Sequence, residues 1–370
     1  MFHHYAQGRH TTQGHKGIPE GHFEEEQGRK GFFGQVSHLI KPQPSKRWVN
    51  IEGPLKPHLF DLVEMPKNFG AWQRVVHNND LAVYNLWLQK KPVSDLTALR
   101  NADGDTLYFC HKGSGDVFTE YGLLKFRVGS YINIPKCVHH TIIPAEDTNF
   151  LVIESKTSYF REPDRGMAGK NAFYDLEALG KPDLAALHLK IKELGANILK
   201  IDVKRADQKT VFTYSESVYD TVGWKGDMFP FTLHISDLMP MISPRVHLPP
   251  SIHTTFVANG FVVCTFLPRP LETDADALKV PFYHQNMDYD EILFYHEGNF
   301  FSRDNLHAGM MTVHPAGFPH GPHPKAVKGV ATKTHTDEVA VMIDTWQPLQ
   351  IDPQASKVEL PEYWKSWMTK

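Results

Sequence analysis

The chain has 370 residues, of which 41% are hydrophobic and 22% charged, with a formal net charge of −3. This balance is typical of a globular protein large enough for two domains, and the weak charge gives no basis for binding nucleic acid or a membrane surface. No run of about 18 apolar residues predicts a transmembrane helix, the start of the chain has no apolar leader, and the three cysteines form no redox or metal-binding pair. We therefore expect a cytoplasmic protein.

Taken in chain order, residues 1–47 are expected to form an irregular arm that is rich in Gly, His, Glu and Gln, with short strands near GFFGQVSHLI. Residues 48–160 contain short β-branched and aromatic runs separated by Gly, Pro, Asn and Asp. Such runs at regular spacing indicate a β-barrel or sandwich.

Residues 161–205 are expected to form a linker with one helix. The segment PDLAALHLKIKELG places Leu184, Leu187, Ile191 and Leu194 on one helical face, with Asp183 as a start signal and Gly195 as a stop signal. Short strands return in residues 206–370, which are expected to form a second barrel that ends in a polar tail.

The two β-rich halves resemble each other. DTLYFCHKG (105–113) and DEILFYHEG (290–298) share Asp, Phe, His and Gly without a gap. Downstream, GSYINIPKCVHH (129–140) and GMMTVHPAGFPH (309–320) share a Gly, a Pro and a final His at the same spacing. Two matched segments at nearly constant offset indicate a duplicated β-domain.

The second half contains a candidate metal site, which the 22 histidines of the chain make worth seeking. His284, Asn286, Glu291 and Gly298 are followed by Gly309, Pro315, Gly317 and His320, which matches the two-part signature of the cupin barrel, with Asn286 replacing the usual second histidine. Two imidazoles and one carboxylate form a facial triad that suits non-haem Fe(II), and the absence of a thiolate disfavours structural zinc.

Two nearby acids, Asp288 and Asp290, are alternatives to Glu291 as the carboxylate ligand. Strand alternation places Asp290 on the opposite face from Glu291, and the spacing to Gly298 selects Glu291. In the first half, Leu99 and Thr106 occupy the positions of His284 and Glu291. Only His140 remains there, opposite His320, so we expect one metal ion per chain and a first barrel without metal.

These residues carry a more specific resemblance. FYHQN, DEILFYHEGNFFSR and LHAGMMTVHPAGFPHGPHP are similar to segments of the homogentisate 1,2-dioxygenase family, particularly its shorter bacterial branch, as are RNADGDTLYF, TEYGLLKFRVGSYINIP, GFFG and EGPLKPH. The resemblance implies an all-β bicupin with an N-terminal arm, assembled as a homo-oligomer. It also implies an Fe(II)-dependent dioxygenase that converts homogentisate and O2 to maleylacetoacetate in tyrosine and phenylalanine catabolism.

Site residues follow from the resemblance position by position. It implies His284, Glu291 and His320 as iron ligands, and His247 in HLPPSI as the catalytic base, with His253 as a rival. Further candidates for contact with the substrate, or for support of the ligands, are Arg303, His314, His323 and Tyr283, although Tyr283 also suits the core.

Two departures from the family pattern bear on the substrate. Four residues rather than three separate Asn286 from Glu291, and Phe300 and Arg303 stand where family members carry a Tyr and a Lys. The alternatives are therefore a dioxygenase for another hydroquinone-like or hydroxybenzoate substrate, and a non-catalytic bicupin that binds a metal or small molecule.

Overall fold

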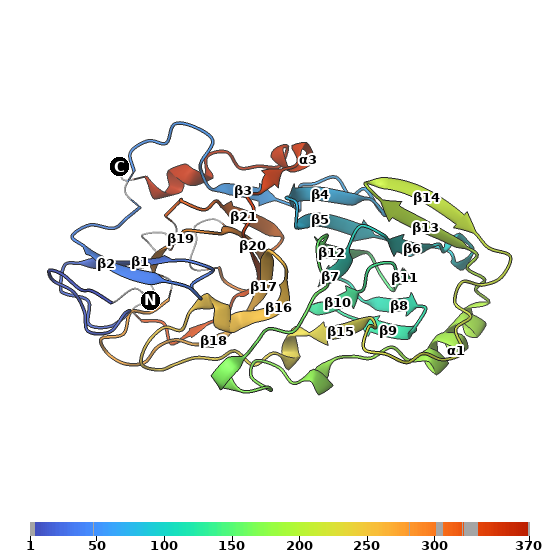
Figure 1. Ribbon diagram of the computed structural model, residues 1–370. Coiled ribbons are helices and arrows are strands. Elements are labelled where there is room, and N and C mark those ends of the chain that lie inside the picture. Colours follow the sequence, from blue (N-terminus) through green and yellow to red (C-terminus); the bar gives the residue numbers. More distant parts are fainter. Residues whose placement is uncertain are drawn as a thin grey trace.

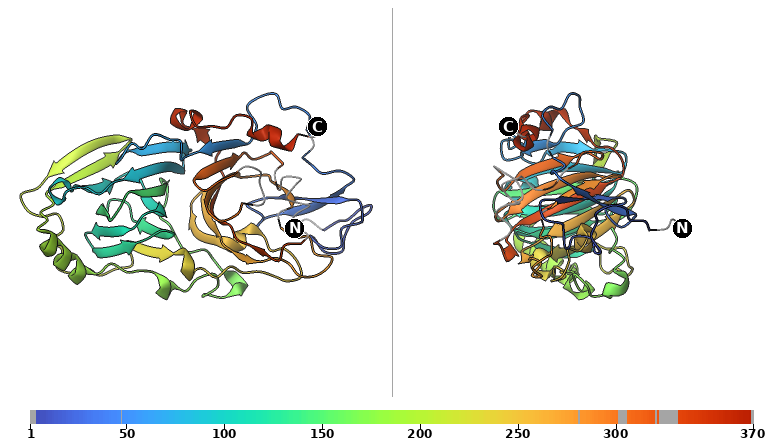
Figure 2. Two further views of the ribbon diagram at one scale, coloured as in Figure 1. Left: turned by 180° about the vertical axis from the view of Figure 1, so that it is seen from behind. Right: turned by 90° about the vertical axis from the view of Figure 1, so that its left-hand side faces the viewer.

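Two β-barrels lie side by side along the long axis of the molecule (Figure 1). The computed structural model describes residues 4–46, 48–280, 282–300, 306–319, 321 and 332–368. The arm strands lie at the free end of the second barrel and the main helix at the free end of the first, and the rear view in Figure 2 shows the same order. The chain is an all-β bicupin with an N-terminal arm, as predicted from the sequence.

The first barrel consists of two facing sheets. The seven-stranded sheet has the order β15 (Phe231–His234), β10 (Ser130–Ile134), β7 (Asp105–Lys112), β12 (Thr148–Ser155), β5 (Leu81–Leu88), β4 (Trp72–His77) and β24 (Gln350–Ile351). The six-stranded sheet has the order β14 (Gln208–Thr213), β13 (Lys200–Arg205), β6 (Ala98–Asn101), β11 (His139–Pro144), β8 (Gly115–Thr119) and β9 (Gly122–Phe126).

The second barrel combines a six-stranded sheet with strands of the arm. The sheet has the order β16 (Thr254–Ala258), β17 (Phe261–Phe266), β23 (Val339–Thr345), β20 (Asp290–Glu297), β21 (Met310–His314) and β3 (His58–Asp61). The arm sheet has the order β19 (Tyr283–Asn286), β1 (Phe23–Gly28) and β2 (Val36–Lys41), and β18 (Arg269–Pro270) pairs with β22 (His335–Thr336). Strand β2 confirms the short strand expected near GFFGQVSHLI, whereas β1 was not predicted from the sequence.

Among the described residues, helical segments are few and lie outside the barrels. They are α1 (Leu184–Leu194), α3 (Pro353–Ser356) and the 3-10 turns η1 (Val93–Asp95), η2 (Gly166–Ala168), η3 (Leu176–Ala178), η4 (Ile235–Asp237), η5 (Pro250–His253) and η6 (Tyr363–Trp367). The predicted helix is confirmed as α1: the Asp183 side chain accepts a hydrogen bond from the Ala186 amide, and Gly195 ends the helix in the left-handed conformation, with φ 59°. Leu187 is buried against the first barrel.

The sheets cross the domain boundaries expected at residues 47/48, 160/161 and 205/206. Strand β3 precedes the first barrel in the chain but pairs with β21 of the second, and β24 follows the second barrel but pairs with β4 of the first. Strands β13, β14 and β15, from the expected linker and second domain, extend the sheets of the first barrel. Edge pairing depends on contacts far apart in sequence, which a local pattern does not contain.

The largest hydrophobic core lies between the barrels rather than inside either one. On β7, Leu107 and Phe109 join this shared core, whereas the alternate residues Tyr108 and Cys110 point into the first barrel. The facing strand β20 contributes Ile292 and Phe294 to the shared core. Because successive side chains on a strand point to opposite faces, a strand with apolar partners on both faces is almost continuously apolar.

The residues shared by the two repeats meet at this contact or shape the turns beside it. His111 on β7 and His296 on β20 are equivalent positions, and their Nδ1 atoms lie 2.8 Å apart in a hydrogen bond. Asp105 accepts a hydrogen bond from the Lys136 amide at 2.8 Å, and Asp290 accepts one from the Ala316 amide at 2.7 Å. The residues that the two repeats share therefore maintain the scaffold of the two barrels.

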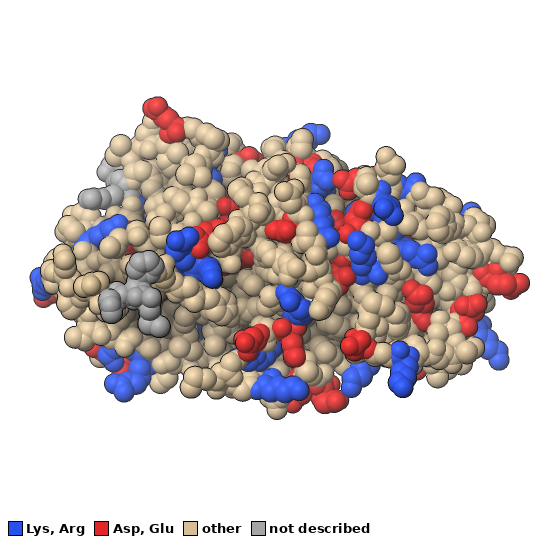
Figure 3. All heavy atoms as spheres, viewed as in Figure 1, with Lys and Arg blue, Asp and Glu red and all other residues tan. Residues whose placement is uncertain are grey.

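The surface carries charges of both signs. Figure 3 shows Lys and Arg side chains interspersed with Asp and Glu over both barrels on this face, which agrees with a net charge of −3. Within the described part of the chain, no helix is both long and apolar enough to cross a membrane.

Candidate metal centre

Strand β19 holds His284 at the wall of a cavity inside the second barrel. The His284 Nδ1–H donates to the carbonyl oxygen of Phe282 at 3.0 Å, which in the neutral ring leaves the lone pair on Nε2. A ligand histidine usually donates its other ring N–H to a carbonyl or carboxylate, because that bond fixes the tautomer and the ring orientation. His284 and Glu291 both line the same cavity, which has a volume of about 110 Å³.

Glu291 on β20 is held from behind by a buried histidine. The His314 Nδ1 lies 2.8 Å from Glu291 Oε1, and the Tyr363 hydroxyl lies 3.5 Å from His314 Nε2. Trp367 packs beside both rings and is buried, with 2% of its surface exposed. The end of the chain, expected to be a polar tail, therefore packs behind Glu291: Tyr363 and Trp367 of the 3-10 turn Tyr363–Trp367 are buried.

A second acid, which sequence reasoning missed, faces Glu291. Asp344 on β23 is the cross-strand partner of Glu291 and lines the same cavity, and Asn286 Nδ2 lies 3.4 Å from Asp344 Oδ2. Burial, reinforced by the charge of Glu291, raises the pKa of Asp344 well above its usual value. Two buried carboxylates on one face create a strong demand for a cation.

The rival acids have structural partners instead. Asp290 accepts hydrogen bonds from the Ala316 and Leu349 amides, both at 2.7 Å. Asp288 pairs with Arg29 of the arm and accepts the Lys30 amide. Neither acid lines the cavity that contains Glu291.

Both candidate bases line the cavity, but only one is oriented by a carboxylate. His247 Nδ1 lies 2.9 Å from Glu272 Oε1. Burial lowers the pKa of His247, although Glu272 opposes this effect. His253 packs against Phe266, and its Nδ1 has no hydrogen-bond partner among the described residues. Burial lowers the pKa of His253 well below its usual value.

Arg269 is a second residue that the sequence reasoning missed. It lines the cavity from β18 with 6% of its surface exposed, and its guanidinium lies over the Phe266 ring and donates to the Leu267 carbonyl at 3.3 Å. No carboxylate in the described part of the chain lies within 4.0 Å of this guanidinium, although the charges of Glu338 and Glu272 act on it from farther away. No spacing in the sequence marks it, since its strand has only two residues.

The other predicted site residues are only partly placed. His320, Arg303 and His323 lie outside the described residues. Tyr283 lies on the opposite face of β19 from His284, is buried and packs against Phe23, so it does not line the cavity. Phe300 packs on Tyr295 in a separate apolar cluster.

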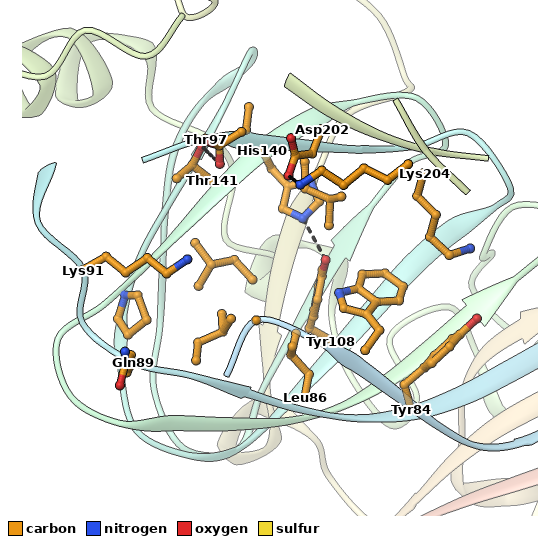
Figure 4. Close-up of a pocket in the computed structure, with 18 of the residues that line it drawn as sticks. Tyr84, Leu86, Gln89, Lys91, Thr97, Tyr108, His140, Thr141, Asp202 and Lys204 are labelled. Atoms are coloured by element: carbon orange, nitrogen blue, oxygen red, sulfur yellow. Dashed lines mark hydrogen bonds and ion pairs between the residues drawn. The ribbon is translucent and has the colours of Figure 1, made fainter. Parts of the chain in front are cut away.

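The first barrel offers different chemistry in its own, larger pocket of about 770 Å³. Figure 4 shows His140 pointing at Tyr108 in this pocket, and His140 Nε2 lies 2.8 Å from the Tyr108 hydroxyl. Thr106 accepts a hydrogen bond from Asn101, and Leu99 lines the pocket. Asp202 and other carboxylates line the same pocket, but His140 belongs to no group of three or more potential ligands within 4.8 Å of one another among the described residues.

Comparison with known proteins agrees with this architecture. The family model described as "Homogentisate 1,2-dioxygenase N-terminal" matches residues 19–235, more than half of the chain. The chain belongs to the homogentisate 1,2-dioxygenase family. This family membership was predicted from the sequence and is confirmed.

Individual relatives differ in how closely they match. A Saccharolobus solfataricus protein that is provisionally named a dioxygenase is 33% identical over 73% of this chain and 70% of its own length. The homogentisate 1,2-dioxygenases of Drosophila melanogaster and Dictyostelium discoideum are 24% and 26% identical, and the match spans 54% and 64% of their lengths. Among solved structures, the Lactobacillus farciminis oxalate decarboxylase formate complex is similar over 83% of this chain, with 14% identity and a TM-score of 0.40.

Proposed function

We propose that this protein is an Fe(II)-dependent ring-cleaving dioxygenase that converts homogentisate and O2 to maleylacetoacetate, in tyrosine and phenylalanine catabolism. The observation that carries the proposal is the lining of one buried cavity. It brings together two candidate metal donors, His284 and Glu291, a carboxylate-oriented imidazole, His247, and a buried cation, Arg269. The proposed partners are O2 and a small aromatic acid, and the proposed assembly is a homo-oligomer.

The donor set suits the metal. His284 and Glu291 would bind Fe(II) with His320 as the third ligand, which leaves coordination positions open for substrate. The residues behind them fit this role, because the Phe282 carbonyl orients His284 and His314 orients Glu291. When bound, the iron would supply activation of O2 and would lower the pKa of a coordinated ring hydroxyl.

His247 is the proposed base. With its Nδ1–H donated to Glu272, its Nε2 is the nitrogen that accepts the proton of a substrate hydroxyl. The lowered pKa of His247 keeps the ring neutral, and therefore able to accept a proton, at neutral pH. Glu272 would then stabilise the imidazolium that forms. Among the described residues, His253 has no such carboxylate partner, so we assign the role to His247.

Arg269 is the proposed anchor for the acetate group of homogentisate. Glu338 and Glu272 act on the Arg269 charge, but neither forms an ion pair with it within 4.0 Å in the described part of the chain. A substrate carboxylate would bind this buried guanidinium through charge-assisted hydrogen bonds. Binding at Arg269 would orient the ring so that one hydroxyl faces His247. Both oxygen atoms of O2 enter the product, so no other reductant is needed.

The test is anaerobic Fe(II) loading followed by oxygen uptake with homogentisate, gentisate and hydroquinone. We expect homogentisate to be turned over fastest, with one O2 consumed per ring. Arg269→Ala should raise the KM for homogentisate by about 10-fold or more, as expected for loss of a charge-assisted bond, and should leave hydroquinone nearly unaffected.

Each other outcome selects a different function. Faster turnover of gentisate or another acid without the acetate methylene would assign a different ring substrate. If the iron-loaded protein consumed no oxygen with any of these compounds, it would be a binding protein rather than an oxygenase.

A further inference from the structure

A second group of metal-ligating side chains lies outside the barrel, in the N-terminal arm. It consists of His15, Glu24 and His38, whose ligand atoms all lie within 4.8 Å of one another. The side chain of Glu24 is fully buried, that of His15 is 9% exposed and that of His38 is 26% exposed. The three residues come from a loop, from β1 and from β2, so only the folded arm brings them together.

The group converges on one carboxylate oxygen. His15 Nδ1 lies 2.7 Å and His38 Nδ1 lies 3.3 Å from Glu24 Oε1. Neither Nδ1 has a partner in hydrogen-bond geometry among the described residues. Donor atoms of a tetrahedral zinc ion are roughly 3.2–3.6 Å apart, as follows from bonds of about 2.0–2.2 Å. The two distances to Glu24 Oε1 are close to this range, and the 4.8 Å limit on the remaining pair means that a small rearrangement of the side chains would allow such an ion to bind.

A fourth residue orients the group. Glu26 is two residues from Glu24 on β1, so strand alternation places both side chains on one face, and Glu26 Oε2 lies 3.3 Å from His15 Nε2. With Nε2–H directed at Glu26, the lone pair of His15 is on Nδ1, the atom that faces Glu24. A carboxylate behind a histidine is the arrangement that supports metal ligands.

The packing around His38 is equally close. A Cβ atom added at Gly14 would lie 2.7 Å from both Cε1 and Nε2 of the His38 ring. Glycine at this position therefore allows the loop to pass against the imidazole.

From this geometry we infer that His15, Glu24 and His38 form a second metal site, which takes a divalent transition-metal ion, with Zn²⁺ as the expected occupant. Two imidazoles and one carboxylate form the open three-ligand zinc arrangement, with water in the fourth position, and not the closed thiolate-containing set that the sequence disfavours for the barrel. The inference does not depend on the proposed oxygenase activity.

The site would fasten the arm to the barrel. Glu26 pairs in register with His284 in the parallel contact of β1 with β19, and it lines the cavity of the second barrel. The His15 ring lies 4.3 Å from the Phe282 ring, whose carbonyl orients His284. An ion at His15 would thus hold in place the strand that supports one wall of the candidate iron site.

A protonated His15 is the competing explanation. Burial alone would lower the pKa of His15, but the two glutamates outweigh this effect and raise it to about 9. The same atoms could then form an ion pair without a metal. The experiment must therefore distinguish a bound ion from a bound proton.

The test measures Co²⁺ and Zn²⁺ binding to the full, untagged chain carrying His284→Ala, which removes the barrel site. We expect one Zn²⁺ per chain by elemental analysis and visible Co²⁺ absorption bands of tetrahedral intensity. Glu24→Gln and His15→Ala should abolish both. Glu25→Gln is the matched control, because Glu25 faces the other side of β1 and pairs with Lys41. His10→Ala, an exposed histidine of the same arm, is the second control.

The outcomes separate the two explanations. Loss of Co²⁺ binding in Glu24→Gln but not in Glu25→Gln, with similar circular dichroism spectra, supports the site. Absence of bound metal in the His284→Ala chain, or binding that survives Glu24→Gln, overturns it and leaves an ion pair. Oxygen uptake by the iron-loaded wild-type chain is measured separately, so failure of the proposed activity is not mistaken for failure of this site.

Discussion

The two barrels share a scaffold but differ in their interiors. Asp105 and Asp290 hold the same turn, and Gly113 and Gly298 both adopt positive φ, near 92° and 94°. At the positions that line the second cavity, however, the first barrel has Leu99 and Thr106 where the second has His284 and Glu291. The two repeats thus share the residues that form the turns of the barrel, and they differ at the positions of the candidate metal ligands.

The most direct test of this difference is to replace His284 of the second barrel with leucine, the residue at the equivalent position of the first barrel. His284→Leu should abolish iron binding and lower kcat/KM by at least about 100-fold, because even groups that only support a ligand are worth about 10–100-fold. Iron content and oxygen uptake measure both effects. Leu99→Ala in the first barrel should leave both unchanged, and an equal loss there would show that the first barrel takes part in catalysis.

A smaller effect is expected behind the ligands. His314 corresponds to Ile134 in the first barrel, and His314→Ile would remove the group that orients Glu291. Iron affinity should fall by about 10–100-fold. His314→Gln keeps a donor and should recover part of the affinity, as measured by competition with a chelator. Equal affinity of the Ile and Gln variants would contradict an orienting role.

The contact between the barrels should make stability sensitive to acid. Burial lowers the pKa of His111 to about 3 and that of His296 to about 4, both below the usual 6.5. The unfolded chain therefore binds more protons below about pH 6.5, and the free energy of unfolding should fall there by up to roughly 1.4 kcal/mol per pH unit for each histidine.

Urea unfolding at pH 7.5, 6 and 5 measures this slope. The double variant His111→Gln, His296→Gln should show a shallower decline than the wild type, because it lacks both titrating groups. Identical slopes would assign the acid sensitivity to other residues.

The smallest effect is expected at the cap of α1. Asp183→Ala removes the side chain that accepts the Ala186 amide, and should cost about 1 kcal/mol of stability. Thermal unfolding should show this loss while kcat/KM stays at the wild-type value. A fall in activity would mean that the first barrel communicates with the site.

The sequence predicted the features that depend on local pattern. Asp183 and Gly195 marked both ends of α1, and alternation separated Glu291 from Asp290 because neighbouring residues on a strand face opposite ways. The two-part signature located a pair of candidate ligands that share one cavity.

Features that depend on distant contacts could not be predicted. Asp344 faces Glu291 only because β23 pairs with β20, some 50 residues away along the chain. Short or separate elements contain Arg269, Glu26 and Tyr363, and no periodic pattern of residues in these elements indicates a role in the site. Their roles arise from tertiary packing, which local propensity does not encode.

The exchange of edge strands also constrains how the protein is made. Strand β3 cannot form its pairing until β21 has been synthesised. Strand β4 remains an edge strand until β24 is synthesised, some 270 residues later in the chain. Neither barrel can therefore be completed while the nascent chain is still short, although domains generally fold as units during synthesis. Genetic excision of either barrel would remove an edge strand from the other, so we expect each barrel expressed alone to be less stable than in the intact chain.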